Sequence, residues 1–183
     1  MNNTFGTGPA GPHAFLRDEK GNLTIFDPPE SCGTYPYSVN DFGAIAGYFG
    51  NCTIGRGFLR NPRGNFSEFD APGAVYQGAN PLSINNFAVI TGYFYDGTNE
   101  HGFEREPKGN ITTFDGAPGA PYTWGIKIND VGTITGYVIL QQSGGTPPHG
   151  FVRAPKGNIT IIDPFGAWGT NPTSISLKSR PCR

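Results

Sequence analysis

The chain has 183 residues, enough for one domain with a hydrophobic core, and its 28 glycines and 17 prolines make up about a quarter of it. The net charge of −1 excludes a strong electrostatic attraction to nucleic acids or anionic membranes, and no apolar run approaches the roughly 18 residues of a membrane span. Aromatic residues, at 13%, need burial and argue against disorder. We therefore expect a folded chain with no nucleic-acid or membrane partner.

The dominant feature of the sequence is a repeat. One segment begins at His13 and recurs at Arg56, His101 and His149, at offsets of 43, 45 and 48 residues. A second segment alternates with it, at 37–49, 82–94 and 126–138. The sequence therefore predicts a single repeat domain over 1–183, with units at about 13–55, 56–100, 101–148 and 149–183.

Each unit contains four predicted strands, named A to D here. Strands A and B belong to the second segment (SVN and IAGYF in its first copy), and strands C and D to the first (GFLR and NFSEFD at Arg56). The strands are rich in β-branched and aromatic residues, and a Lys/Arg-Gly-Asn turn between C and D is typical of a β-hairpin. Four antiparallel strands in about 45 residues indicate one blade of a β-propeller.

These motifs resemble a known repeat. His-Ala-Phe at 13–15, His-Gly-Phe at 101–103 and 149–151, and the pattern Ile-Asn-x-x-Gly-x-Ile-x-Gly-Tyr are similar to the HAF-type repeat of bacterial extracellular proteins. The resemblance covers 13 to about 176, and it departs from the pattern at Arg56 and in the last unit, which lacks a Gly-Tyr strand. It implies a propeller-like array and an extracellular or cell-surface location, although the chain begins with no signal peptide, and it implies no defined activity.

The predicted strand order leaves two ways to complete the ring. The chain begins with strands C and D (13–27) and ends with D (158–163) and an A strand (172–177), with Thr4-Phe5 as the candidate B strand between these ends. Joined, the ends would close a β-propeller of about four four-stranded antiparallel blades. Alternatively, the chain is a half-ring that forms a homodimer and so completes a larger propeller. Both alternatives are all-β.

A histidine or arginine precedes an aspartate by 14 residues in every unit. The Gly-Asn turn lies midway, so folding the hairpin brings the two residues together across the strands. A His–Asp dyad could act in general-base catalysis, with His101, His149 and His13 as candidates. A structural clamp is the favoured interpretation, because the pair occurs four times and Arg56 cannot act as a base. The pairs are His13 and Asp27, Arg56 and Asp70, His101 and Asp115, and His149 and Asp163.

Ligand binding is predicted on one face of the array. The A–B and C–D turns are short and nearly identical, whereas the D–A and B–C loops, which share the other face, are longer and differ. Aromatic rings with nearby amides suit a sugar or another small polar ligand. The candidate ligand-binding residues are Tyr35, Tyr37, Tyr76, Asn80, Tyr122, Trp124, Trp168 and Asn171; packing of these rings between blades is the alternative.

The remaining candidates concern metal and cysteine. Hard cations prefer oxygen ligands, so calcium near the axis is one interpretation of residues at the ends of strand A, and capping of turns by their side chains is the other. Cys32 and Cys52 lie in loops on the same face and could form a disulfide, which leaves Cys182 unpaired. The candidate metal ligands are Asn40, Asp41, Asn85, Asn129 and Asp130.

We therefore expect a small secreted-type β-propeller that binds a glycan or similar ligand on its loop-rich face. A hydrolase of esters, lactones or phosphotriesters, with an axial metal or a histidine on that face, is the first alternative. An inactive fragment of a longer repeat array is the second.

Overall fold

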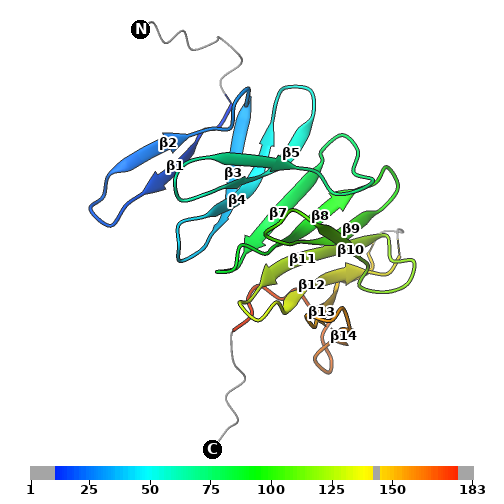
Figure 1. Cartoon of the computed structure of the whole chain (residues 1–183). Coiled ribbons are helices and arrows are strands. Elements are labelled where there is room, and N and C mark those ends of the chain that lie inside the picture. Colours follow the sequence, from blue (N-terminus) through cyan, green and yellow to red (C-terminus); the bar gives the residue numbers. More distant parts are fainter. Residues whose placement is uncertain (1–10, 142–144, 177–183) are drawn as a thin grey trace, which may run out of the picture.

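The computed structural model describes residues 11–141 and 145–176, and these contain fourteen β-strands and no helix (Figure 1). The predicted all-β fold is confirmed. No helix of the described residues is long and apolar enough to cross a membrane. The strands are β1 (Ala14–Arg17), β2 (Leu23–Phe26), β3 (Gly33–Val39), β4 (Ile45–Gly50), β5 (Gly55–Arg60), β6 (Phe66–Phe69), β7 (Ala79–Ile84), β8 (Ile90–Tyr95), β9 (Glu100–Arg105), β10 (Ile111–Phe114), β11 (Tyr122–Ile128), β12 (Ile134–Ile139), β13 (His149–Arg153) and β14 (Ile159–Ile162).

Twelve of these strands form three blades of four antiparallel strands each. The first blade is β3–β4–β5–β6, the second β7–β8–β9–β10 and the third β11–β12–β13–β14, so the predicted order A-B-C-D is confirmed. The second and third blades are also joined by a parallel bridge between Tyr122 and Glu100. The remaining strands, β1 and β2, pair only with each other among the described residues.

The hairpins form where the sequence places glycine after a basic residue. The glycines of the four C–D turns have φ values from 90° to 99°, a left-handed conformation that disfavours side chains with a Cβ. These glycines are Gly21, Gly64, Gly109 and Gly157.

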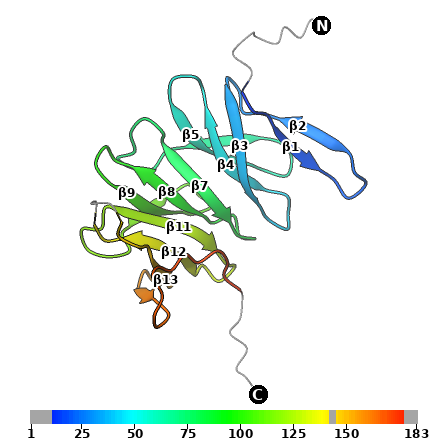
Figure 2. The ribbon, with the colours of Figure 1, turned by 180° about the vertical axis from the view of Figure 1, so that it is seen from behind.

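The core lies between the blades. Phe58, Phe103 and Phe151 occupy equivalent positions in β5, β9 and β13, and each is completely buried. Each phenylalanine belongs to a separate apolar cluster that includes residues of the preceding blade or hairpin. Figure 2 shows the blades fanning out in sequence order. Each blade is therefore attached to its neighbour by one of these apolar clusters, and we call each such contact a joint.

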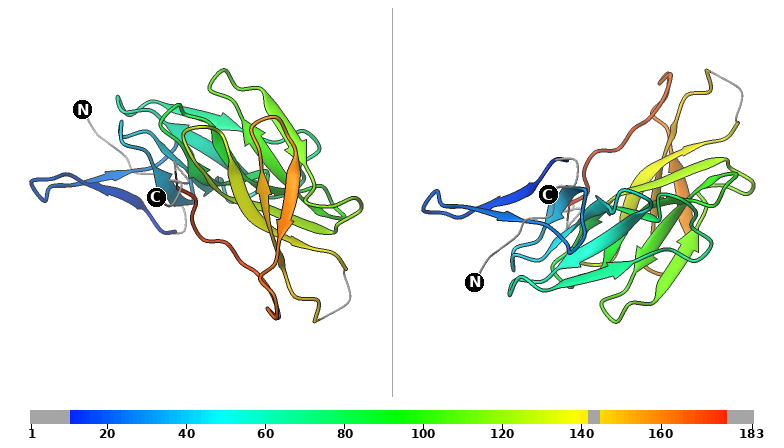
Figure 3. Two further views of the ribbon diagram at one scale, coloured as in Figure 1. Left: turned by 90° about the horizontal axis from the view of Figure 1, so that it is seen from below. Right: turned by 90° about the horizontal axis from the view of Figure 1, so that it is seen from above.

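The ends of the array do not meet as a closed four-bladed ring requires. Seen from below and above, the β1–β2 hairpin and β14 lie at opposite ends of an open arc (Figure 3). Residues 172–176 form no strand, contrary to the predicted terminal A strand, because no strand of the described residues lies beside them to supply hydrogen bonds. The proposed B strand at Thr4-Phe5, and Cys182, lie outside the described residues.

Candidate functional site

A tyrosine occupies the same position in the second strand of every blade. Tyr48, Tyr93 and Tyr137 each follow a glycine, in β4, β8 and β12. Strand pairing places Tyr48 opposite Tyr35, and Tyr137 opposite Trp124. Directly paired residues point to the same side of a sheet, so these rings contact one another, with centroids 6.0 Å apart for Tyr35 and Tyr48 and 5.2 Å for Trp124 and Tyr137.

Trp124 also joins two blades. Its ring stacks on Tyr93 of the preceding blade, with centroids 4.1 Å apart and planes 3° from parallel. Its Nε1 donates a hydrogen bond to Oε2 of Glu100, the first residue of β9. The backbone N–H of Glu100 in turn donates to the carbonyl of Pro121, at 2.8 Å. The indole is therefore fixed on one face and at its polar edge.

A hollow of about 220 Å³ opens beside this indole. It is smaller than the roughly 300–1,000 Å³ of pockets for drug-sized ligands, and its size suits a ligand of one ring. Three aromatic rings and an isoleucine form apolar walls, and one carboxylate supplies a polar group. The lining residues are Glu100, Tyr122, Trp124, Tyr137 and Ile139.

Tyr93 and Tyr137, whose rings contact the indole of Trp124, are held in the protonated form. Burial, with the Glu100 carboxylate as a further cause, raises the pKa of Tyr93 to about 12. The same two causes raise the pKa of Tyr137. At neutral pH both groups therefore carry a hydroxyl hydrogen, and the hydroxyl of Tyr137, which lines the hollow, is a donor available to ligand oxygen atoms.

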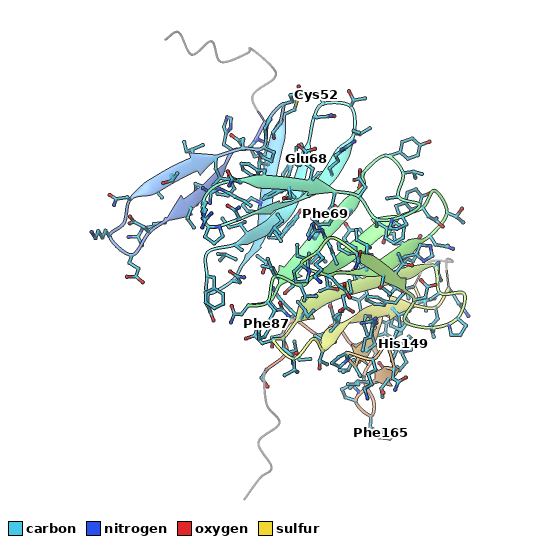
Figure 4. The ribbon with its side chains drawn as sticks, in the orientation of Figure 1. Cys52, Glu68, Phe69, Phe87, His149 and Phe165 are labelled. Atoms are coloured by element: carbon cyan, nitrogen blue, oxygen red, sulfur yellow. A yellow bond between two sulfur atoms is a disulfide. The ribbon has the colours of Figure 1, made fainter. Side chains whose placement is uncertain are left out.

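A second hollow, of about 260 Å³, lies on the first blade. Its wall includes Tyr48, Tyr76 and Gln77, together with Cys52. Cys52 forms a disulfide with Cys32, as the sequence allowed, and the two Cα atoms are 5.4 Å apart. Figure 4 shows Cys52 in the β4–β5 loop, and Phe87 at the turn end of the neighbouring blade.

The predicted ligand-binding residues do not lie together in one hollow. Tyr122 and Trp124 line the first hollow and Tyr76 the second, whereas Tyr35, Tyr37, Asn80, Trp168 and Asn171 line neither. The assignment of five of these residues to loops was wrong. Strand A begins earlier than expected, because it pairs with strand B along its whole length, and it contains Tyr35, Tyr37, Asn80, Tyr122 and Trp124.

Three residues that line the first hollow, Glu100, Tyr137 and Ile139, are not among the predicted ligand-binding residues. Tyr137 belongs to the repeated Gly-Tyr pair of predicted strand B, whereas the sequence favours the variable loops for ligand binding. Glu100 precedes a repeated histidine and was read as part of a loop. Glu100 could have been found from the sequence because it is the one carboxylate at this position of the repeat. Pro12, Gly55 and Pro148 occupy the equivalent positions in the other units.

All four predicted hairpin pairs are brought together. The histidine Nδ1 atoms of His13, His101 and His149 lie 2.6–2.7 Å from the aspartate 14 residues later. Arg56 lies 3.6 Å from both Asp70 and Glu68, so the longer guanidinium spans two carboxylates where an imidazole contacts one.

His101 differs from the other histidines because a second carboxylate reaches it. Its Nδ1 is 2.6 Å from Asp115 and its Nε2 is 3.1 Å from Asp96. Burial acts to lower the pKa of the imidazole, but the hydrogen bonds and charges of Asp115 and Asp96 outweigh it and raise that pKa. With both nitrogens donating, the ring has no lone pair left to accept a proton.

The pKa of His101 provides a direct test of this geometry. We expect its imidazole to titrate above the ordinary value of about 6.5 in an NMR pH titration, and to titrate lower in Asp96→Asn. The charged ring stabilises the fold below pH of about 6.5, and this contribution is lost as pH rises through the raised pKa. The destabilisation caused by His101→Gln should accordingly shrink between acidic and alkaline pH. An imidazole that titrates at or below the ordinary value contradicts the arrangement.

The candidate metal ligands form hydrogen bonds between blades. The side-chain Nδ2 atoms of Asn40 and Asn85 donate to the carbonyls of Asn85 and Asn129, each at 3.0 Å. Their Oδ1 atoms accept backbone N–H groups of their own turns. Asn86 donates to both Asp41 and Asp130, at 2.7 and 2.9 Å. In residues 11–141 and 145–176 no three His, Cys, Asp or Glu side chains gather as a metal site, and calcium stays a prediction.

Comparison with known proteins identifies the architecture. No protein-family model and no curated protein matches the chain. Two solved structures of virginiamycin B lyase from Staphylococcus aureus are similar in fold, each with a TM-score of 0.52 and 18% sequence identity. One is the selenomethionine-substituted protein and the other a catalytically inactive variant with quinupristin. The chain has a β-propeller fold.

The likeness to the lyases is one of fold alone, because the identity is so low. It covers 84% and 87% of this chain but 49% and 51% of the lyase chains. The chain thus spans about half the length of these propeller proteins.

Proposed function

We propose that the chain is a ligand-binding module that takes a glycan or a similar small polar ligand in the hollow beside Trp124. The observation that carries this proposal is the combination of three aromatic rings and one carboxylate around a space of about 220 Å³. Sugar rings present apolar faces and hydroxyl edges, so aromatic walls and a few polar groups are the chemistry that recognises them.

The individual groups have distinct roles in this proposal. One carboxylate oxygen of Glu100 is occupied by the indole N–H, which leaves the other to accept a ligand hydroxyl. The protonated phenol of Tyr137 donates to ligand oxygen atoms. Tyr122 supplies a ring that stacks on no other aromatic ring of the described residues and so can stack on a sugar.

A hydrolase of esters, lactones or phosphotriesters is the alternative function for this face. The strongest candidate base is His101, the histidine with two carboxylates. Because both its nitrogens donate hydrogen bonds, the geometry favours a structural role for it. An inactive fragment of a longer repeat array is a further alternative, and binding by the isolated chain would argue against it.

A location outside the cell fits these features. Disulfides persist in oxidising compartments, and the bond between Cys32 and Cys52 joins two loops of the face that we propose for binding. The resemblance to extracellular HAF-type repeats supports the same location.

The proposal predicts that removing one ring weakens binding. A glycan array probed with the labelled chain should select an oligosaccharide. Titration calorimetry should give a Kd that rises by about two- to tenfold in Tyr122→Ala, because ring stacking contributes about 0.5–1.5 kcal/mol. Phe87→Ala is the matched control, since Phe87 is 65% exposed and lines neither hollow. An array without any bound glycan, or equal Kd values for Tyr122→Ala and the wild type, would count against the proposal.

A further inference from the structure

The joint between consecutive blades has two complementary halves. One half is a phenylalanine and an arginine on strand C; the other is a phenylalanine at the end of the preceding strand D. Each arginine lies over the ring of that phenylalanine, at 4.7–4.8 Å from its centroid. The three joints pair Arg60 with Phe26, Arg105 with Phe69, and Arg153 with Phe114.

The β1–β2 hairpin carries the strand C half of a fourth joint, and no strand D of the described residues packs against it. Phe15 and Arg17 are equivalent to Phe103 and Arg105, yet Phe15 is 63% exposed whereas Phe103 is completely buried. The register places Ile25 opposite Phe15 and Leu23 opposite Arg17, so these side chains share the same face. An apolar face of this kind is a docking surface in every other unit of the chain.

The last blade carries the other half of the joint. Ile162 stands at the position of Phe69 and Phe114, and it is 45% exposed, since no further blade of the described residues covers it. Phe165 and Trp168, just beyond it, are fully and 81% exposed. Figure 4 shows Phe165 at the outer extremity of the chain, beyond β14.

The A strands of the blades, β3, β7 and β11, also lack a partner at the two ends of the described array. The hydroxyl of Ser38 accepts a hydrogen bond from the backbone N–H of Ile84 in the next blade, at 3.2 Å. Val39, which is equivalent to Ile84, is 56% exposed, whereas Ile84 is buried. No A strand precedes Val39 within the described residues.

The C-terminal segment has the sequence that would fit this gap. Residues 171–175 read Asn-Pro-Thr-Ser-Ile, matching Asn-Pro-Leu-Ser-Ile at 80–84, so Ser174 corresponds to Ser38 and to Ser83. Asn129 donates to the carbonyl of Ser176 at 3.0 Å, which continues the asparagine series into this segment. The segment therefore already lies where the next A strand belongs.

We propose that a second copy of this chain docks at these ends. The hairpin of each copy packs against the Ile162 end of the other, and the segment 171–176 of each lies beside β3 of the other. Two identical head-to-tail contacts related by a two-fold axis close a ring. The two ends carry complementary halves of one joint, so a second copy of the chain offers at each end the half that the first copy lacks there. Closure within one chain does not fit, since its two ends lie at opposite ends of the arc (Figure 3).

A charge exchange across the contact tests this assembly. Analytical ultracentrifugation should give a dimer for the 183-residue chain, and monomers for Phe15→Glu and for Ile162→Lys. An equimolar mixture of the two variants should form a heterodimer, because one contact then pairs Glu with Lys and the other is native. Phe87→Ser is the matched control and should stay dimeric, since Phe87 is 65% exposed but lies on the A–B turn. The unfolding midpoint of each variant shows that it is folded.

Other results would overturn the proposal. A wild-type chain that sediments as a monomer or as a polydisperse series excludes the closed pair. Variants that both remain dimeric place the contact elsewhere. Folded monomeric variants that fail to associate when mixed show that Phe15 and Ile162 do not face each other.

Discussion

Replacing Phe103 by alanine is expected to lower the free energy of unfolding by about 3–5 kcal/mol. The ring is completely buried and meets Phe69 of the preceding blade edge to face, with centroids 6.1 Å apart. Its loss leaves a cavity in the joint between two blades, where Arg105 is also buried. The natural free energy of unfolding is only about 5–15 kcal/mol for a domain, so this one change removes a large part of it. Denaturant unfolding monitored by tryptophan fluorescence measures the difference.

Two further variants test whether the destabilisation comes from the buried position and the volume of the ring. Phe87→Ala removes an equally large ring that is 65% exposed, and it should change the free energy by no more than about 0.5 kcal/mol. Phe103→Leu keeps most of the volume and should cost less than alanine. If Phe103→Ala is no more destabilising than Phe87→Ala, the blades are not held together by this joint.

The repeat made the architecture predictable before any coordinates. A histidine or arginine 14 residues before an aspartate, with Gly-Asn midway, is a local pattern, and local hairpins follow from turn chemistry. His13 and Asp27, for example, meet because the chain between them forms a single hairpin. The strand order within each blade follows in the same way from antiparallel neighbours with short connections.

The candidate site could not be predicted to the same degree, because it depends on the angle between blades. Tyr93 and Trp124 are 31 residues apart and belong to different blades, so their stacking is decided by how two blades pack. The hydrogen bond from Trp124 to Glu100 crosses the same boundary. Spacing along the chain carries no information on such contacts, whereas it does on pairs within a hairpin.

The open ring was one of two predictions that the sequence could not separate. Closure depends on whether residues 171–176 can reach the β1–β2 hairpin, which is a matter of blade curvature. Asn129 holds Ser176 next to the third blade, where the next A strand belongs, but the β1–β2 hairpin lies at the other end of the arc (Figure 3). The exposed Phe15 and Ile162 are the consequence of this geometry, and they are apolar because the repeat that encodes them is apolar in every unit.

The disulfide should carry the second largest effect on stability. Cys32 and Cys52 are 20 residues apart in the sequence, and closing a loop of this length restricts the unfolded chain by about 3 kcal/mol. The bond ties the residue before β3 to the loop after β4, in the first blade. Among the described residues only the β1–β2 hairpin precedes this blade, so the disulfide stabilises a blade that lacks a complete neighbour on that side. The double variant Cys32→Ser/Cys52→Ser is therefore expected to unfold at lower denaturant concentration than the wild type.

A reducing agent distinguishes this effect from a packing defect of the serines. Reductant should lower the free energy of unfolding of the wild type by a similar amount and leave the double variant unchanged. Limited proteolysis should then cut first near Asn51–Gly55, because that loop loses its covalent attachment while its backbone is held mainly by the hydrogen bonds of Asn51. A wild-type chain whose unfolding is indifferent to reductant would show that the two sulfurs are not bonded in solution.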